Sequence, residues 1–193
     1  MAKTQDEILE IFKQSGAFLE GHFVLTSGLH SPHYVEKFRV LEHPGVTAQL
    51  CAEFVEHWAD AKPTVVVGPA TGGIILAHET ARQMGLRAMF TERVDGTMTM
   101  RRGFALTPED RVLLVEDVVT TGGSVFEVLD VVTETGAQIA GLALLVDRSG
   151  GAVNFGIPSK ALMTLNVVTH RPDDCPLCRD GVPVTKPGRS GKS

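Results

Sequence analysis

The apolar residues of this chain recur with a helical period in four segments and form short unbroken runs in five others. The helical period predicts helices at residues 4–16, 44–58, 74–84 and 124–135. The runs, rich in Val, Leu and Ile, predict strands at residues 64–68, 87–90, 111–115, 138–146 and 161–168. The runs at 64–68 and 111–115 are typical of strands buried on both faces of a sheet.

Helices and strands alternate along the sequence with short connections. This alternation predicts an α/β fold with a central, mostly parallel sheet flanked by helices, and ligands bind such sheets at the carboxyl ends of the strands. The turn-rich segment 21–37 predicts a short hairpin, or hood, outside the core. Segment 91–103 has no clear period and is interpreted as a loop or a mobile β-arm.

Two helix starts carry the spacing of a capping box, in which a hydroxyl residue is followed three positions later by Glu. Thr4 and Glu7 form the first pair, and Ser124 and Glu127 form the second. We therefore expect both pairs to cap their helices.

A chain of 193 residues fits one domain, and 43% apolar with 21% charged residues is ordinary for a globular protein. We expect a single domain at 1–170, with a hood formed by about residues 1–40 plus the C-terminal segment, followed by a Pro-rich basic tail at 171–193. The net charge of −5 argues against a nucleic-acid partner, since such proteins are usually basic. It does not exclude a small anion held in a local pocket of N–H groups and Arg.

Nothing in the sequence predicts contact with a membrane. No apolar run reaches eighteen residues, and the polar, acidic start lacks the pattern of a signal peptide. The three cysteines, Cys51, Cys175 and Cys178, are too few for a disulfide framework and indicate a reducing compartment. We therefore expect a cytoplasmic protein.

The most informative segment begins where the strand at 111–115 ends. It runs Glu116, Asp117, Val118, Val119, Thr120, Thr121, Gly122, Gly123, Ser124 and leads into a predicted helix. A phosphate group binds convergent N–H donors at the positive end of a helix, and paired glycines allow the backbone to approach it. The two carboxylates could accept hydrogen bonds from ribose hydroxyls or position a hydrated Mg²⁺. The segment therefore predicts a site for a ribose 5-phosphate group.

The alternative is a tight strand-to-helix turn with Ser124 as the cap, which explains the serine but not the carboxylates, threonines and glycines before it. The segment is neither a Walker loop, since it lacks the Gly-Lys-Ser/Thr ending, nor a dinucleotide fingerprint, since the glycine spacing differs.

Four motifs together resemble one family. Residues 116–124 resemble the phosphoribosyl-diphosphate (PRPP) signature of the type I phosphoribosyltransferases. Residues 23–34 resemble the hood motif of the orotate phosphoribosyltransferases, residues 67–73 the diphosphate loop, and residues 145–148 a strand that ends in Asp-Arg. The resemblance implies transfer of ribose 5-phosphate from PRPP to orotate, giving orotidine 5′-monophosphate and diphosphate in pyrimidine biosynthesis. It also implies Mg²⁺, a homodimer with shared active sites, and a non-proline cis peptide in the diphosphate loop.

The resemblance assigns roles to individual residues. Asp117 and Arg93 are expected to be catalytic, and residues 116–124 to bind PRPP. Thr120 and Arg148 are expected to contact orotate, since a guanidinium can form paired bonds to a carboxylate. The expected diphosphate contacts are Thr71, Gly72, Arg93, Arg101 and Arg102.

The chain departs from the family pattern where basic residues are expected. Gly72 and Thr26 stand at two such positions, and the mobile catalytic loop keeps Arg93 but has no Lys or His. Arg101, Arg102 and Lys37 are candidates to supply the missing charge. The alternatives are a solvated strand edge for Arg101 and Arg102, and a surface ion pair with Asp147 or another carboxylate for Arg148.

Cys175 and Cys178 have the spacing of half a zinc knuckle, but a full site needs four ligands. With no second pair evident in the sequence, we predict no metal-ligating residues. Two other functions stay open: a phosphoribosyltransferase for another base, such as a purine, and a non-catalytic PRPP sensor that regulates transcription.

Overall fold

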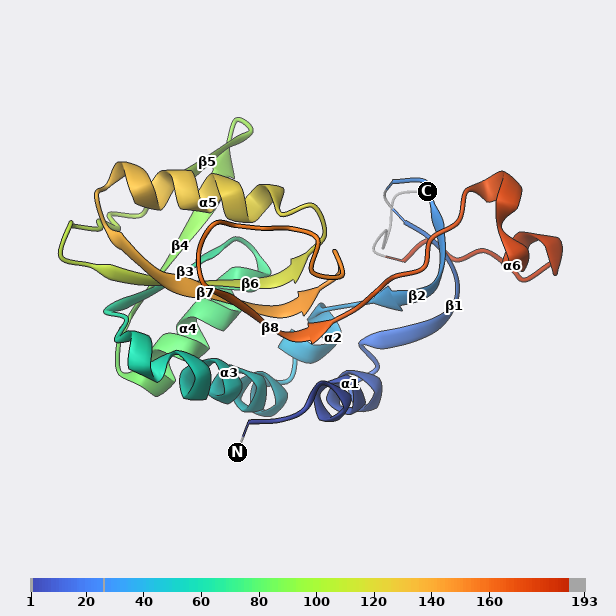
Figure 1. Cartoon of the computed structure of the whole chain (residues 1–193), viewed down its shortest axis with the longest axis horizontal. Coiled ribbons are helices and arrows are strands. Elements are labelled where there is room, and N and C mark those ends of the chain that lie inside the picture. Colours follow the sequence, from blue (N-terminus) through green and yellow to red (C-terminus); the bar gives the residue numbers. More distant parts are fainter. Residues whose placement is uncertain (1, 26, 188–193) are drawn as a thin grey trace.

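The computed structural model describes residues 2–25 and 27–187, and its centre is a six-stranded sheet with the order β5-β4-β3-β6-β7-β8 (Figure 1). The strands are β3 (Val65–Pro69), β4 (Arg87–Val94), β5 (Thr97–Met100), β6 (Arg111–Val119), β7 (Gln138–Asp147) and β8 (Ser159–Thr164). All neighbours pair in parallel except β4 and β5. The predicted α/β fold with a mostly parallel sheet is confirmed.

Helices cover both faces of this sheet. One face carries α1 (Gln5–Gln14), α2 (Phe38–Leu41), α3 (Pro44–Trp58) and α4 (Gly72–Met84), and the other carries α5 (Gly123–Glu134) (Figure 1). A short 3-10 helix, η1 (Ala59–Ala61), follows α3. The central strand β6 divides its side chains between the two cores: Leu113 and Val115 pack toward α3 and α4, and Val112 and Leu114 toward α5.

The four predicted helices are present, and the strand expected at 161–168 lies a little earlier, at Ser159–Thr164. For segment 91–103 the β-arm interpretation is confirmed, since β4 continues to Val94 and pairs antiparallel with β5. Asp95 and Gly96 form the turn, with φ values of 51° and 85°. Two consecutive positive φ values are typical of the tight turns that join hairpin strands.

One capping prediction is confirmed and the other is wrong. Thr4 Oγ1 accepts a bond from the N–H of Glu7, and Glu7 accepts one from the N–H of Thr4. Helix α5 instead begins at Gly123, after Gly122 in a left-handed conformation, with no side-chain cap. Ser124 thus lies inside the helix, and the carboxylate of Glu127 binds Arg93 rather than the backbone.

A separate two-stranded sheet forms the hood at one end of the molecule (Figure 1). Strands β1 (Phe18–Val24) and β2 (His30–Val35) pair antiparallel, as the hairpin prediction requires. The expectation that this segment lies outside the core is wrong in part, because His22, Phe23, His30 and Ser31 are buried.

The C-terminal segment covers the hood and explains this burial. It contains η2 (Pro172–Asp174) and the one-turn helix α6 (Pro176–Arg179). Isolated bridges join His30 to His170 and Phe23 to Thr185, so the segment pairs with both hood strands. Residues 188–193 of the predicted tail lie outside the described residues.

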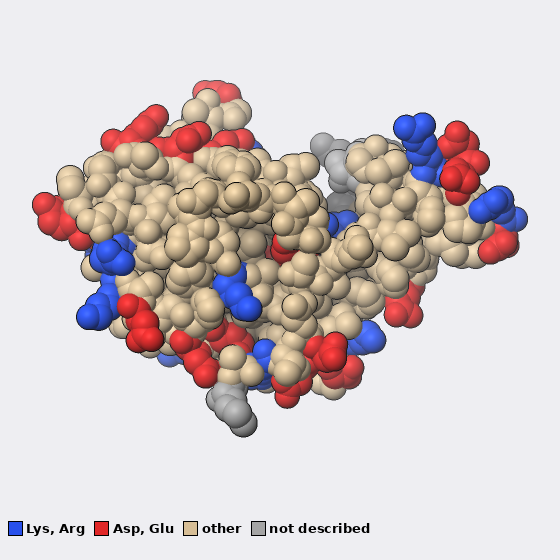
Figure 2. All heavy atoms as spheres, in the orientation of Figure 1, with Lys and Arg blue, Asp and Glu red and all other residues tan. Residues whose placement is uncertain are grey.

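Two further features concern the helices and the charged side chains. No helix in the described part of the chain combines the length and apolar character needed to cross a membrane. Figure 2 shows one face of the molecule, on which Lys and Arg side chains are scattered among Asp and Glu side chains.

Candidate active site

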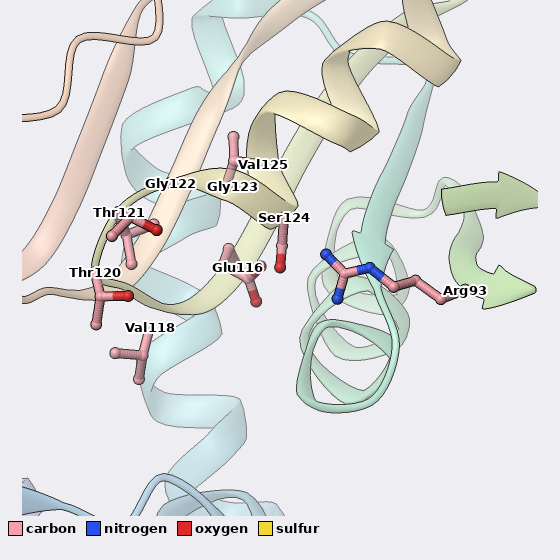
Figure 3. Close-up of a pocket in the computed structure, with 10 residues that line it drawn as sticks. Arg93, Glu116, Val118, Thr120, Thr121, Gly122, Gly123, Ser124 and Val125 are labelled. Atoms are coloured by element: carbon pink, nitrogen blue, oxygen red, sulfur yellow. The ribbon is translucent and has the colours of Figure 1, made fainter. Parts of the chain in front are cut away.

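The carboxyl end of β6, the loop after it and the start of α5 enclose a cavity of about 210 Å³. Residues 118–125 form most of its wall, and the side chains of Glu116 and Arg93 complete it (Figure 3). All residues of the predicted phosphate segment except Asp117 therefore line a single concave site. It lies beyond the carboxyl ends of parallel strands, where this kind of sheet binds ligands.

The loop presents backbone groups rather than a closed layer of side chains. Gly122 has a φ of +80°, which only glycine adopts readily, and this bend leads directly into the first turn of α5. A Cβ atom on Gly122 would lie 2.9 Å from the side chains of both Phe155 and Val153. The first N–H groups of a helix have no partner within the helix, so the cavity has the donors and the positive end that an anion needs.

Glu116 lies under this loop at the end of β6 and is buried. Its carboxylate accepts a hydrogen bond of 2.9 Å from the N–H of Asp117. Burial, followed by the neighbouring negative charge of Asp117, raises the pKa of Glu116 to about 8. Placing positive charge or hydroxyl donors in the cavity would lower that pKa again.

Asp117 points to the other side of β6, where it meets Lys37 from the end of the hood. Lys37 Nζ lies 2.8 Å from Oδ1 and 2.7 Å from Oδ2 of the carboxylate, and the Asp117 side chain is 3% exposed. Gly72, at the start of α4, makes room for this carboxylate. A Cβ atom there would lie 2.9 Å from Cγ of Asp117 and would overlap with Oδ2.

Arg93, near the end of β4, reaches the cavity from the opposite side (Figure 3). Its guanidinium makes a paired contact with Glu127 of α5, at 3.0 and 2.8 Å. This ion pair raises the pKa of Arg93, so the group carries a positive charge at the cavity.

A second cavity of about 580 Å³ lies beside the first and shares Val118 with it. The end of the hood lines it with residues 34–38, and Arg148 after β7 lines it from the sheet. Burial lowers the pKa of Arg148, and its Nε atom has no hydrogen-bond partner among the described residues. The Asp147 carboxylate accepts bonds from the N–H groups of Ser149 and Gly151 at 2.7 and 3.0 Å. Arg148 pairs with no carboxylate among the described residues, so the ion-pair alternative is wrong.

Four of the five expected diphosphate residues, Thr71, Gly72, Arg101 and Arg102, do not line either cavity. Arg102 binds Glu92 on the β4–β5 hairpin at 2.9 Å, and Arg101 lies 4.0 Å from the same carboxylate. Thr71 precedes α4 without capping it by a side-chain bond. The Ala70–Thr71 peptide bond is cis, as the family resemblance implies. Thr26 lies outside the described residues.

Two residues that line the second cavity have only weak signals in the sequence. Tyr34 is the last residue of the hood motif, and Lys37 is one of three candidates for a missing charge. Lys37 and Asp117 are 80 positions apart. No local pattern reveals a contact of that kind, although the hood motif itself was a usable signal for Tyr34.

With this geometry established, comparison with known proteins identifies the family. The family model described as "Phosphoribosyl transferase domain" matches residues 39–166. The orotate phosphoribosyltransferase of Pelotomaculum thermopropionicum is 51% identical over 185 residues, which are 96% of this chain and 97% of that protein. The orotate phosphoribosyltransferase of Heliobacterium modesticaldum is 50% identical over 187 residues, 96% of this chain and 98% of that protein.

Solved structures agree in fold. The orotate phosphoribosyltransferase of Aeropyrum pernix has a TM-score of 0.65 at 27% identity and covers 82% of this chain and 93% of its own. The Mycobacterium tuberculosis orotate phosphoribosyltransferase in complex with inorganic phosphate has a TM-score of 0.68 at 25% identity, with 83% and 95% covered. The chain belongs to the phosphoribosyltransferase family and, within it, to the orotate phosphoribosyltransferases.

Proposed function

We propose that this protein transfers ribose 5-phosphate from PRPP to orotate, releasing diphosphate and forming orotidine 5′-monophosphate for pyrimidine biosynthesis. The observation that carries the proposal is the pair of adjoining cavities that meet at Val118. One is built for an anion at the start of a helix, and the other holds a half-buried Arg148 whose Nε atom has no hydrogen-bond partner among the described residues.

In the first cavity the 5-phosphate takes the N–H groups of residues 121–124, with the hydroxyls of Thr120, Thr121 and Ser124 as further donors. A dianion at this position is stabilised by the positive end of α5. Glu116 lines this cavity from the last half of β6, beside the sugar that follows the phosphate, and Asp117, which lines neither cavity, would share its carboxylate between the sugar and Lys37. Their carboxylates accept hydrogen bonds from the ribose hydroxyls.

In the second cavity the guanidinium of Arg148, whose Nε atom is buried without a partner, receives the orotate carboxylate or a ring carbonyl. A planar anion can make two charge-assisted hydrogen bonds to a guanidinium at once and would satisfy this atom. Thr120 stands between the two cavities on the loop and is the second predicted orotate contact.

Breaking the bond between the anomeric carbon and the diphosphate develops positive charge on the sugar and negative charge on the leaving group. Fixed donors aimed at the leaving group stabilise that change. Arg93, positively charged at the cavity wall, is the described residue best placed for this role. The family resemblance implies that the loop at Thr71 and Gly72 contributes further donors. Arg101 and Arg102 serve the diphosphate only if they leave Glu92, a change that closure of the β4–β5 hairpin would require.

The donor set near the cavities suits Mg²⁺ held mainly through the substrate. Mg²⁺ prefers oxygen ligands and keeps several waters, binding through one or two carboxylates plus phosphates. Glu116 and Asp117 offer carboxylate oxygens, yet both oxygens of Asp117 contact Lys37, so an all-protein cage is not formed. When bound with PRPP, Mg²⁺ supplies positive charge to the diphosphate.

We further propose that the protein acts as a cytoplasmic homodimer, in which the hairpin of one protomer closes over the active site of its partner. The exposed position of Arg101 and Arg102 on that hairpin supports this arrangement. We also propose that residues 1–170 form one phosphoribosyltransferase domain, followed by the tail at 171–193.

The test is an assay of orotidine 5′-monophosphate and diphosphate formation from PRPP and Mg²⁺ with a panel of bases. We expect turnover with orotate and none with adenine or xanthine. Turnover of a purine but not orotate would instead assign the protein to a purine substrate. Tight PRPP binding with no diphosphate release with any base would favour the sensor.

A further inference from the structure

Four potential metal ligands converge where the C-terminal segment covers the hood. They are His22 of β1, His30 of β2, Cys175 just before α6, and Cys178 within α6. One ligand atom from each lies within 4.8 Å of those from all the others. The site lies at the α6 end of the molecule, away from the β6–α5 loop (Figure 1).

Three nitrogen–sulfur separations are close to those of a tetrahedral site, and the nitrogen–nitrogen separation is somewhat shorter. Zinc with two nitrogen and two sulfur ligands places nitrogen and sulfur about 3.5 Å apart and two nitrogens about 3.3 Å apart. Here Nε2 of His22 lies 3.5 Å from Sγ of Cys175 and 3.7 Å from Sγ of Cys178. Nδ1 of His30 lies 3.3 Å from Sγ of Cys178 and 2.9 Å from Nε2 of His22.

The orientation of His22 favours a metal over a group held by hydrogen bonds alone. Its Nδ1 lies 2.8 Å from the carbonyl oxygen of Val182, which fixes the proton on Nδ1 and leaves a lone pair on Nε2. That one lone pair faces three neighbours, His30 and both thiols, and can accept only one hydrogen bond. A cation at the centre can instead accept a lone pair from each of the four ligand atoms. A ligating imidazole usually donates its other N–H to a carbonyl or carboxylate, as His22 does here to Val182.

We propose that these four residues bind one structural Zn²⁺ per chain. All four positions are taken by the protein and three of the ligands are buried, so no position is left for a substrate. Both thiols lose their protons on binding, because thiolate is the form that ligates zinc. Cys175 and Cys178 thus form one half of the site, and the hood supplies the other half, which no sequence spacing reveals.

The zinc would join the C-terminal segment to the hood. His170 and Thr185, on either side of the cysteines, already pair with the hood strands, and the metal closes the segment between them. Strand β2 begins at His30 and ends at Val35, beside the larger cavity. Fixing the start of β2 therefore helps to hold that wall of the cavity in place.

The test uses the full-length chain purified without a histidine tag and dialysed against buffer free of metal and chelator. We expect elemental analysis to find about one zinc per chain. The Mg²⁺ used in activity assays does not affect this measurement. Replacement of zinc by Co²⁺ should give the intense visible d–d bands of a four-coordinate site and a thiolate-to-cobalt charge-transfer band. Removal of zinc by a strong chelator should lower Tm by at least about 5 °C.

Cys178→Ser should lose stoichiometric zinc and the charge-transfer intensity, whereas Cys178→His, which restores a nitrogen ligand, should keep the metal. Cys51→Ala is the matched control, because Cys51 is a buried cysteine inside α3, outside the cluster. The control should retain its zinc. Wild-type protein with less than a tenth of a zinc per chain and no four-coordinate cobalt spectrum would overturn the proposal. So would a Cys175–Cys178 disulfide in protein purified under reducing conditions, or unchanged zinc in Cys178→Ser.

Discussion

Lys37 of the hood and Asp117 of the central strand form an ion pair, with Nζ 2.8 Å from Oδ1 and 2.7 Å from Oδ2. The carboxylate is almost fully buried, whereas the ammonium group keeps some contact with water. The pair connects the hood to the floor of the proposed sugar site. Lys37 also brings an ammonium group to the carboxylate that lies against Gly72, the position where the family resemblance leads us to expect a basic residue.

Lys37→Met should lower the free energy of unfolding by about 1–3 kcal/mol, because it leaves a buried carboxylate without its counter-ion. Asp117→Asn in the same chain removes that charge and should recover most of the loss. Urea denaturation of the two single variants and the double variant measures the coupling. Additive effects in this cycle would mean that the pair contributes no stability.

Gly72→Ala should displace Asp117, since the added Cβ would overlap with its carboxylate. We expect the KM for PRPP to rise by about tenfold or more and the free energy of unfolding to fall by about 1–3 kcal/mol. Gly45→Ala is the matched control: Gly45 lies in α3, and a Cβ there meets nothing within 4 Å. That change should be neutral or slightly stabilising. Equal behaviour of the two variants would remove the steric role of Gly72.

Thr121→Ala should weaken PRPP by about 10–100-fold, the loss of a hydrogen bond to a charged group worth about 1.5–3 kcal/mol. The KM for PRPP and its dissociation constant measure this directly. Thr133→Ala is the control, because Thr133 is an exposed threonine of α5 that lies outside the cavity. If both variants bind PRPP as the wild type does, the phosphate does not lie in this loop.

Most of the fold and the phosphate loop could be predicted because their signals are local. The apolar strand, the two carboxylates and the paired glycines follow one another within fourteen residues, and the chain direction alone brings them to one edge of the sheet. The predicted cap of α5 at Ser124 is wrong because Gly122, in a left-handed conformation, leads directly into a helix that starts at Gly123. Glu127, the other half of the predicted capping box, binds Arg93 instead.

Contacts between distant segments could not be predicted. The cysteines of α6 meet His22 and His30 about 150 positions earlier, and neither histidine belongs to a recognisable ligand spacing. Lys37 meets Asp117 from a position 80 residues earlier, and neither residue lies in a local pattern that announces the pair. In each case the missing information is which surfaces meet, and that depends on the whole fold.

The raised pKa of Glu116 predicts a pH dependence of stability. Because its folded-state pKa of about 8 lies above the ordinary value, folding favours the protonated carboxyl. The stabilising contribution is complete below pH about 4.5 and is lost as the pH rises through 8, with a slope of at most about 1.4 kcal/mol per pH unit. Glu116→Gln keeps an acceptor for the N–H of Asp117 but cannot ionise.

The free energy of unfolding of the wild type, measured in the absence of ligand, should therefore fall relative to that of Glu116→Gln between pH 5 and 8. Denaturation curves at half-unit pH intervals give the difference, in which the contributions of other groups largely cancel. Two parallel pH profiles would show that Glu116 ionises as an ordinary carboxyl does.

Arg148→Met should separate the two substrates. The guanidinium lies in the larger cavity with no partner for Nε, so we expect orotate to lose about 1.5–3 kcal/mol of binding, a rise in its KM of about 10–100-fold. The KM for PRPP should change less than threefold, because the 5-phosphate lies on the other side of Val118. Arg148→Lys should recover only part of the loss, since an ammonium group cannot make the paired bonds of a guanidinium. Arg82→Met is the control: Arg82 is a mostly exposed arginine of α4 that pairs with Glu79, and its loss should alter neither constant. A rise in the KM for PRPP alone would place Arg148 in the sugar-phosphate site and leave the orotate carboxylate without its proposed partner.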